Sequence, residues 1–169
     1  LRHYGFSLVP YALARNADEA VAAAAKMEYP VVMKICGPKI LHKTDVGGVK
    51  LNLRDEQSVR TAYENMIASV REKMGKDIEI WGVLIQKMLP PGKETILGMS
   101  RDERFGPLIM FGLGGIYTEA LKDVSFRLAP IRKNSANVMV KSIRSIKLLE
   151  GVRGEAPSDM VAIGDALLR

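Results

Sequence analysis

Two short apolar runs in the first third of the chain enclose a long polar segment. Residues 31–35 (VVMKI) are apolar except for Lys34, and residues 49–53 (VKLNL) alternate between apolar and polar positions. The segment between them contains lysines, a histidine and a pair of glycines. Because runs and alternations of this length are typical of strands, the pattern predicts a strand, a long charged loop and a second strand.

Apolar residues three and four positions apart predict two helices beside these strands. Asn16 has Glu19 three positions later, which is the spacing of a capping box, and the first helix is expected to run to Met27. Asp55 is expected to cap the second helix and Gly75 to end it. Strands and helices alternate along this part of the chain, so the predicted fold class is α/β.

The same criteria divide the rest of the chain. Further strands are predicted at residues 6–9, 78–87, 94–99, 107–111 and 125–130, and further helices at residues 134–143, 145–149 and 158–168. We expect the strand at 94–99 to return beside the strand at 78–87. Residues 107–111 (PLIMF) are continuously apolar, so we expect them to form a buried central strand. Ser158 is expected to cap the last helix.

A break in the pattern separates two parts of the chain. Residues 88–92 (MLPPG) contain two prolines and a glycine, which interrupt regular structure. We expect this break to be a hinge between a smaller lobe, roughly residues 18–87, and a larger one, roughly residues 88–169. The chain does not begin with Met and ends inside a helical pattern at Arg169, so we expect a piece of a longer protein.

Composition and charge narrow the class of ligand. The chain has 25 basic and 19 acidic residues, mostly interspersed, and only 6% aromatic residues. This disfavours a nucleic-acid partner, which calls for basic clusters and stacking rings, and suits a polyanionic small molecule such as a nucleotide or coenzyme A. No apolar run approaches the roughly 20 residues that span a bilayer, so we expect no membrane partner. The single cysteine is compatible with a reducing cytoplasm, where we expect the protein to lie.

Lys34 has two interpretations. It can be an outward-facing lysine of an edge strand, where lysines are common. It can also be a partly buried lysine, which is costly unless an anion pairs with it. The lysines in the loop that follows favour the second interpretation, with Lys34 as a phosphate ligand.

The polar loop after this strand contains His42. On pattern alone, His42 is a solvent-exposed loop histidine. The functional interpretation is a phosphoryl acceptor, because a neutral imidazole nitrogen is nucleophilic near neutral pH. Lys39 and Lys43 flank it, and their charges suit a negatively charged group that is being transferred.

Residues 86–94 also have two interpretations. A strand that ends in Gln86, Lys87, Met88 and Leu89 offers backbone groups to a flat heterocycle, and Glu94 can accept hydrogen bonds from ribose hydroxyls. The alternative is a plain hairpin with a Pro-Pro corner.

Three other sites are disfavoured or excluded. No G-x-x-x-x-G-K-[ST] sequence is present, which excludes a P-loop. Residues 112–115 (GLGG) follow an apolar run but lack the third spaced glycine of a dinucleotide-binding loop. One cysteine and two histidines are too few for a zinc cluster.

The combined pattern resembles the ATP-grasp domain of the NDP-forming (ADP-forming) acyl-CoA synthetases. The resemblance covers essentially the whole chain in ordered, correctly spaced motifs. These are residues 29–35 (YPVVMKI), 37–49 (GPKILHKTDVGGV), 82–102 (GVLIQKMLPPGKETILGMSRD), 105–131 (FGPLIMFGLGGIYTEALKDVSFRLAPI) and 148–159 (LLEGVRGEAPSD). It implies an ATP-grasp fold, with two α+β lobes and a nucleotide site between them.

The resemblance also implies roles for individual residues. Lys34 matches the lysine that contacts nucleotide phosphates, and His42 matches the histidine that is phosphorylated transiently. Residues 86–89 (Gln86, Lys87, Met88 and Leu89) match the adenine-binding hinge, and Glu94 matches the ribose ligand. The residues that match the phosphate loops are Lys43, Asp45, Gly47, Gly48, Gly112, Gly114, Gly115, Glu119, Asp123 and Arg127.

The implied activity is that of an acid–thiol ligase, an ADP-forming acetate–CoA ligase. The implied cofactors are ATP or ADP and Mg²⁺, and the implied partner is a CoA-binding portion in the same chain or in a separate subunit. The family's strand with an acidic-Asn-Pro motif, which supplies metal ligands, is expected beyond Arg169. We therefore expect the isolated piece to be inactive.

Three alternatives remain at this point. The chain can be a regulatory, non-catalytic domain of a protein-lysine acetyltransferase, although the presence of Lys34 and His42 argues against that. It can be an ATP-grasp ligase that forms an acyl phosphate without a phosphohistidine, which the His-Lys-Thr-Asp loop disfavours. It can also be a scaffold that binds little.

Overall fold

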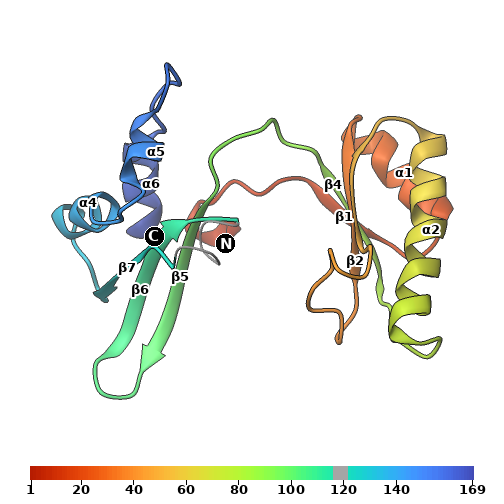
Figure 1. Ribbon diagram of the computed structural model, residues 1–169, viewed down its shortest axis with the longest axis horizontal. Coiled ribbons are helices and arrows are strands. Elements are labelled where there is room, and N and C mark those ends of the chain that lie inside the picture. The colour runs from red at the N-terminus through yellow and green to blue at the C-terminus, as the bar shows by residue number, and fades with distance from the viewer. Residues whose placement is uncertain (116–121) are drawn as a thin grey trace. The chain divides into compact units, whose positions relative to one another are not determined.

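The computed structural model describes residues 1–115 and 122–169 (Figure 1). Glu119, which the resemblance places near the phosphates, lies outside the described residues. The chain divides into a first unit, Ser7–Pro90, and a second unit, which joins Leu1–Phe6 to Pro91–Arg169. Each unit contains one antiparallel sheet with helices, which confirms the predicted α/β class.

The first unit contains a four-stranded sheet in the order β1-β4-β2-β3, with every neighbouring pair antiparallel. Its elements are β1 (Tyr11–Ala14), α1 (Ala17–Met27), β2 (Val31–Cys36), β3 (Val49–Leu53), α2 (Glu56–Met74) and β4 (Gly82–Lys87). The predicted strand–loop–strand segment is confirmed as β2 and β3. The predicted strand at 78–87 is confirmed only from Gly82 onward.

Alternation along β2 and β4 gives this sheet two different faces. Val31, Met33 and Ile35 are fully buried, as are Val83 and Ile85, and they belong to one core cluster with residues of α1 and α2. Because successive strand residues point to opposite faces, the residues between them lie on the other face of the sheet. Within this unit both helices pack on the first face (Figure 1).

The predicted caps of α1 and α2 are confirmed, with one difference in detail. The Asn16 side chain accepts a hydrogen bond from the Glu19 backbone N–H at 2.8 Å. The Glu19 carboxylate accepts from the Arg15 backbone N–H at 2.8 Å, one residue earlier than in a standard capping box. Asp55 forms a reciprocal box with Ser58 at the start of α2, and Gly75 follows its end.

The second unit contains a three-stranded antiparallel sheet in the order β5-β6-β7. Its elements are η1 (Arg2–Tyr4), β5 (Thr95–Asp102), β6 (Gly106–Leu113), β7 (Val124–Leu128), α4 (Lys133–Lys141), α5 (Ile146–Glu150) and α6 (Met160–Leu167). Phe111 and Leu113 of β6 are buried in a cluster with Met139 of α4 and Leu149 of α5. β6 lies between β5 and β7, so the central position predicted for residues 107–111 is confirmed. The predicted burial of this whole run is wrong, because among residues 107–111 Phe111 alone is buried.

Two predictions about strands are wrong. The strand expected at 6–9 is absent, because β1 begins only after Pro10, and the Phe6 ring lies under the Arg169 guanidinium at 5.6 Å from the ring centroid. Residues 94–99 do not return beside 78–87. Both edges of β4 are already paired, with β1 and β2, and β5 pairs with β6 instead. The Asp102 carboxylate closes that hairpin by accepting from the Arg104 and Phe105 amides at 2.8 and 2.9 Å.

The cap of the last helix also differs from the prediction. Asp159, not Ser158, caps α6, because the Asp159 carboxylate accepts from the Ala162 amide at 2.9 Å. The Ser158 amide instead donates to the Leu149 carbonyl at 2.8 Å. This hydrogen bond connects the segment before α6 to α5.

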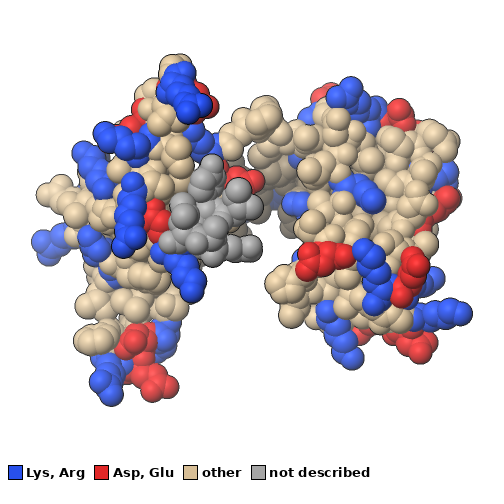
Figure 2. Space-filling model, in the orientation of Figure 1, with Lys and Arg blue, Asp and Glu red and all other residues tan. Residues whose placement is uncertain are grey.

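Figure 2 shows basic and acidic side chains mixed over the visible face, with no large field of one sign. Among the residues that the structure describes, no helix is long and apolar enough to cross a membrane.

The base of the loop between β2 and β3 is closely packed around Gly48. The Ile35 amide donates to the Gly48 carbonyl at 2.8 Å, and the Gly48 amide donates to the Lys43 carbonyl at 2.7 Å. A Cβ atom at position 48 would lie 2.3 Å from Ile35 Cγ2 and 2.9 Å from the Lys43 carbonyl oxygen. Gly47 adopts φ +72°, a backbone conformation that favours glycine. The two glycines therefore fix the loop base.

We expect Gly48→Ala to destabilise the chain by about 1–3 kcal/mol, because the added methyl group overlaps Ile35 and the Lys43 carbonyl. Gly92→Ala is the matched control, since a Cβ atom there would meet nothing within 4 Å. Urea denaturation of both variants measures the difference. Equal unfolding midpoints for the two would contradict the close packing at Gly48.

Candidate functional site

Lys34 lies on an interior strand of the first sheet, because β2 is flanked by β4 and β3. This excludes the interpretation of Lys34 as an edge-strand lysine. Its register partners are Leu84 on β4 and Val49 on β3. Lys34 is half-buried, and within residues 1–115 and 122–169 its ammonium group has neither an ion pair nor a hydrogen bond. A partly desolvated cation without an internal partner is a candidate ligand for an anion.

The register places further residues on the same face as Lys34. Leu84 pairs with Leu13 of β1, and Gln86 pairs with Val32 of β2. We call Leu13, Val32, Lys34, Leu84 and Gln86 the helix-free face. It combines an apolar surface with one amide and one cation, which is the composition of many small-molecule sites.

The sequence indicates only two of these five residues, Lys34 and Gln86, as ligand contacts. Leu13, Val32 and Leu84 were missed because they look like ordinary core residues. The alternation along each strand indicates two faces, but strand order and register decide which residues meet across the sheet, and neither can be read from the sequence. Leu13 and Leu84 meet in the pairing of residues 11–14 with 83–86, and Val32 meets Gln86 in the pairing of β2 with β4.

Two backbone amides at the end of β4 and just after it already have hydrogen-bond partners in the chain. The Lys87 amide donates to the Pro10 carbonyl at 3.3 Å, and the Met88 amide donates to the Pro30 carbonyl at 3.1 Å. The Lys87 ammonium donates to the Glu28 carbonyl at 2.7 Å, at the end of α1. Lys87 therefore points to the helix side of the sheet, opposite to Gln86. The Gln86 side chain and the exposed Leu89 remain as its candidate contacts for a ligand.

The loop between β2 and β3 is held at one end and projects at the other. The Lys73 ammonium and the Ser69 hydroxyl of α2 donate to the Asp45 and Val46 carbonyls, at 2.9 and 3.1 Å. His42 lies beyond these anchors and is exposed. The structure thus presents the imidazole to solvent on an anchored loop, while the Lys43 and Asp45 backbones belong to the loop base.

In the second unit the structure brings Glu94 together with Gly114 and Gly115. The Gly114 amide donates to the Glu94 carbonyl at 2.7 Å. A Cβ atom would lie 2.9 Å from Glu94 Cβ at position 114, and 3.2 Å from Glu94 Oε2 at position 115. Only glycine fits beneath the Glu94 side chain at position 114, so residues assigned separately from the sequence form one local structure.

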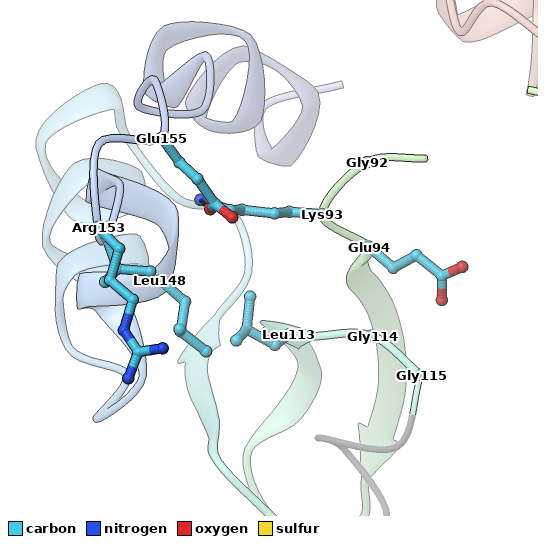
Figure 3. A pocket seen from close by; sticks show the side chains of 10 residues that line it. Gly92, Lys93, Glu94, Leu113, Gly114, Gly115, Leu148, Arg153 and Glu155 are labelled. Atoms are coloured by element: carbon cyan, nitrogen blue, oxygen red, sulfur yellow. Dashed lines mark ion pairs between the residues drawn. The ribbon is translucent and has the colours of Figure 1, made fainter. Parts of the chain in front are cut away.

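These residues border a cavity of about 820 Å³ (Figure 3). Three segments line it: residues 92–94 before β5, residues 113–115 after β6, and α5 with the turn that follows it. The Lys93 ammonium and the Glu155 carboxylate form an ion pair at 3.1 Å across the cavity rim. Arg153 and Leu148 form a further part of its wall.

Lys93, Arg153 and Glu155 were missed as site residues. The motif LLEGVRGEAPSD had been recognised as part of the family pattern, but no residue in it was given a role. Its glycines on both sides of Val152-Arg153 were the available signal, because they indicate a tight turn that presents the residues between them.

Asp123 and Arg127 have local partners. The Asp123 carboxylate accepts from the Arg144 and Ser145 amides at 2.8 and 2.7 Å, and also from the Ser145 hydroxyl. Partial burial opposes its ionisation, but the hydrogen bonds from Ser145 and Arg144 outweigh this and hold the pKa of Asp123 below its ordinary value. Arg127 Nη1 donates to the neighbouring Phe126 carbonyl at 2.7 Å. Neither residue lines the cavity.

No group of three or more His, Cys, Asp or Glu side chains that could hold a metal ion occurs among residues 1–115 and 122–169. The carboxylates near the cavity, Glu94 and Glu155, do not converge: Glu155 is paired with Lys93, and Glu94 points away from that pair (Figure 3). The described residues therefore do not fit a Mg²⁺ site.

Comparison with known proteins identifies the family. A family model described as an ATP-grasp domain matches residues 1–169. The chain is 46% identical to the acetate–CoA ligase (ADP-forming) I subunit beta of Pyrococcus furiosus, over the whole chain and 72% of that subunit. It therefore belongs to an ATP-grasp family whose members include beta subunits of ADP-forming acetate–CoA ligases.

Other relatives are longer. The chain is 50% identical to the acetate–CoA ligase (ADP-forming) I of Archaeoglobus fulgidus and 49% identical to the 4-hydroxybutyrate–CoA ligase (ADP-forming) of Nitrosopumilus maritimus. The alignment covers the whole chain in both cases, but the chain spans only 24% of the length of either relative.

Solved structures confirm the fold. An acetyl-coenzyme A synthetase 1 of Ca. Korarchaeum cryptofilum, in complex with coenzyme A and Ca-AMPCP, matches with a TM-score of 0.94 and 46% identity, over 99% of this chain and 72% of that chain. Another structure of that enzyme contains Mg-AMPPCP and a phosphohistidine segment that points towards the nucleotide binding site. It matches with a TM-score of 0.83 and 43% identity, over 99% and 70% of the two chains.

The hydrogen bonds of Asp123 predict a pH-dependent stability. Because its pKa is lower in the folded chain, its carboxylate stabilises the fold above the unfolded pKa of about 3.9, and this contribution is lost as the pH falls through the folded pKa. We expect Asp123→Ala to lower the free energy of unfolding at pH 7 by about 1–2 kcal/mol. Below the folded pKa the difference from the wild type should shrink.

Urea denaturation at several pH values between 7 and 2 measures this difference. Asp165→Ala is the control, because Asp165 is an exposed carboxylate of the same unit. A wild-type-minus-variant difference that stays constant from pH 7 to pH 2 would contradict the role of the ionised Asp123.

Proposed function

We propose that this chain is the nucleotide-binding ATP-grasp portion of an ADP-forming acyl-CoA synthetase. The observation that carries the proposal is Lys34, a half-buried cation on an interior strand with no anionic partner in the described part of the chain. Around it the helix-free face supplies apolar side chains and one amide. A nucleotide combines a flat apolar base with a polyanionic tail, so its chemistry complements this face.

The individual roles proposed follow the sequence motifs. Lys34 holds the phosphates by charge, and Gln86 with Leu89 contacts the adenine. Glu94 accepts hydrogen bonds from the ribose hydroxyls. Gly114 and Gly115 bring backbone close to the ligand, which their contact with Glu94 supports.

The whole protein is proposed to interconvert acyl-CoA, ADP and phosphate with carboxylate, CoA and ATP. In the direction of ATP cleavage, a neutral nitrogen of His42 attacks the γ-phosphorus of ATP. The N–P bond forms as the bond between the γ-phosphorus and the β,γ-bridging oxygen breaks, and ADP leaves. The position of His42 beyond the loop anchors supports this role, because an acceptor on a projecting loop is accessible to a second reaction centre.

Mg²⁺ is proposed as a cofactor only on the strength of relatives, one of which contains Mg-AMPPCP. The described residues of this chain do not assemble a site for it, so we assign it no step. Positioning and charge neutralisation by Lys34 and the glycine backbone are what this chain contributes to phosphoryl transfer.

The proposed partner is a CoA-binding portion. It is part of the same chain or a separate subunit, since the relatives include both a beta subunit and ligases about four times as long as this chain. The reported relatives are all named as ligases or synthetases, which does not favour a regulatory domain of an acetyltransferase. We propose acetate or a related small carboxylate as the acid that is activated.

We expect Lys34→Met to weaken ADP binding by about tenfold or more, because the variant loses a charge-assisted contact with a phosphate group. Lys50→Met is the matched control. It removes the same charge from the adjacent strand, where Lys50 pairs with Met33 and not with Lys34. Calorimetric titration of both variants with ADP measures the difference. A similar loss in the two would indicate a general charge effect and would contradict the role of Lys34.

We expect His42→Asn to abolish phosphoryl labelling of the full-length protein by ATP labelled at the γ-position, because the acceptor nitrogen is lost. The label should be acid-labile, as phosphoramidates are. The other histidine of the chain gives the control, His3→Asn, which should keep wild-type labelling. Undiminished acid-labile labelling of the His42→Asn protein would contradict the proposal that His42 is the phosphoryl acceptor.

A further inference from the structure

The turn after α5 carries backbone strain at an arginine. Arg153 adopts φ +52°, between Gly151 at φ +97° and Gly154 at φ +86°. The two glycines adopt such values at little cost, but an arginine does not. A strained non-glycine residue persists when the surrounding structure holds it, and such residues cluster at functional sites. Glycine would adopt this backbone conformation at position 153 with less strain. The presence of an arginine there therefore needs an explanation in terms of its side chain.

The surrounding structure holds this turn firmly against the cavity. The Glu155 amide donates to the Val152 carbonyl at 3.0 Å, which closes the turn around Arg153. The Ser158 amide donates to the Leu149 carbonyl at 2.8 Å, which fixes its return. The ion pair of Lys93 with Glu155 joins the turn to the segment before β5. The strain at Arg153 is therefore balanced by contacts on both sides of it.

The charges of the cavity leave one cation without a counter-ion. Lys93 and Glu155 neutralise each other at 3.1 Å. The Glu94 side chain leaves the cavity on the side away from that pair (Figure 3). Across residues 1–115 and 122–169, the Arg153 guanidinium has no ion pair or hydrogen bond, and its side chain lies beside Leu148. Arg153 is exposed, so water hydrates its guanidinium. The cavity therefore combines an apolar wall with one exposed guanidinium that pairs with no described carboxylate.

We propose that Arg153 binds a phosphate group of the ligand that occupies this cavity, and that the strained turn exists to present it. A guanidinium suits phosphate because its planar donors make two parallel hydrogen bonds to it. Gly114 and Gly115, which the sequence motifs assign to a phosphate loop, border the same cavity. We therefore take the ligand to be the nucleotide of the proposed function, on which this inference rests. Lys93 and Glu155 are then positioning residues, which hold the turn through their ion pair.

The strain gives the test a signature that a structural role would not produce. Arg153→Gly removes the strained arginine, so we expect it to raise Tm by about 2 °C. The same variant should bind ADP about tenfold or more weakly, because the guanidinium is lost. Arg153→Gln should weaken ADP binding equally. Neither variant should change the binding of adenosine, which has no phosphate.

Arg104→Gln is the matched control, since Arg104 is an exposed arginine of the same unit in the turn between β5 and β6. It should bind ADP like the wild type. The experiment is calorimetric titration of the wild-type chain and these variants with ADP, adenosine and inorganic pyrophosphate, together with thermal unfolding. Pyrophosphate binding should depend on Arg153 in the same way as ADP binding.

The outcomes separate this inference from the proposed function. If Arg153→Gly and Arg153→Gln bind ADP like the wild type while Lys34→Met does not, Arg153 is not a phosphate ligand and the nucleotide function stands. If the wild type binds pyrophosphate through Arg153 but binds ADP no more tightly than pyrophosphate, the anion site stands and the nucleotide function fails. If the wild type binds neither, both are overturned. A lower Tm for Arg153→Gly would overturn the proposed cause of the strain.

Discussion

The burial of one face of β2 is the constraint on which the rest of the first unit depends. Val31, Met33 and Ile35 are fully buried with α1 and α2. Because side chains alternate along a strand, burying these three residues forces Lys34 onto the opposite face. A register slip of one residue would place the lysine in the core, where an unpaired charge is costly. The apolar pattern that drives folding thus also fixes the position of the candidate phosphate ligand.

In the second unit, the candidate site is formed by turns and by close contacts between backbone segments, and not by one face of a sheet. Gly114 is possible only as glycine, because Glu94 lies directly over it. The turn at Arg153 is clamped by its own hydrogen bonds and by the ion pair of Lys93 with Glu155. Most residues of this site belong to segments next to strands and helices. Such segments are where rigid elements commonly position functional residues.

The sequence predicted local structure well and long-range pairing poorly, for physical reasons. The caps at Asn16 and Asp55 and the strands at 31–35 and 49–53 depend on residues close in the chain, which pattern reasoning can read. The partner of β5 depends on which strand edges remain available, and that cannot be read from spacing.

The candidate site divides in the same way. Lys34, His42 and Glu94 were found because they carry distinctive chemistry in recognisable motifs. Leu13 and Leu84 were missed because an apolar residue shows its role only when the sheet register is known. Arg153 was missed because its significance lies in a left-handed backbone, which no composition rule indicates.

The central proposal is that the nucleotide contacts the helix-free face of the first sheet. Methyl NMR of the whole chain during a titration with ADP tests it directly, because the two faces carry different methyl groups. We expect concentration-dependent shifts for Leu13, Val32 and Leu84, with much smaller shifts for Val83 and Ile85 beneath the helices. Shifts confined to the helix side, or no shifts in this sheet at saturating ADP, would contradict it.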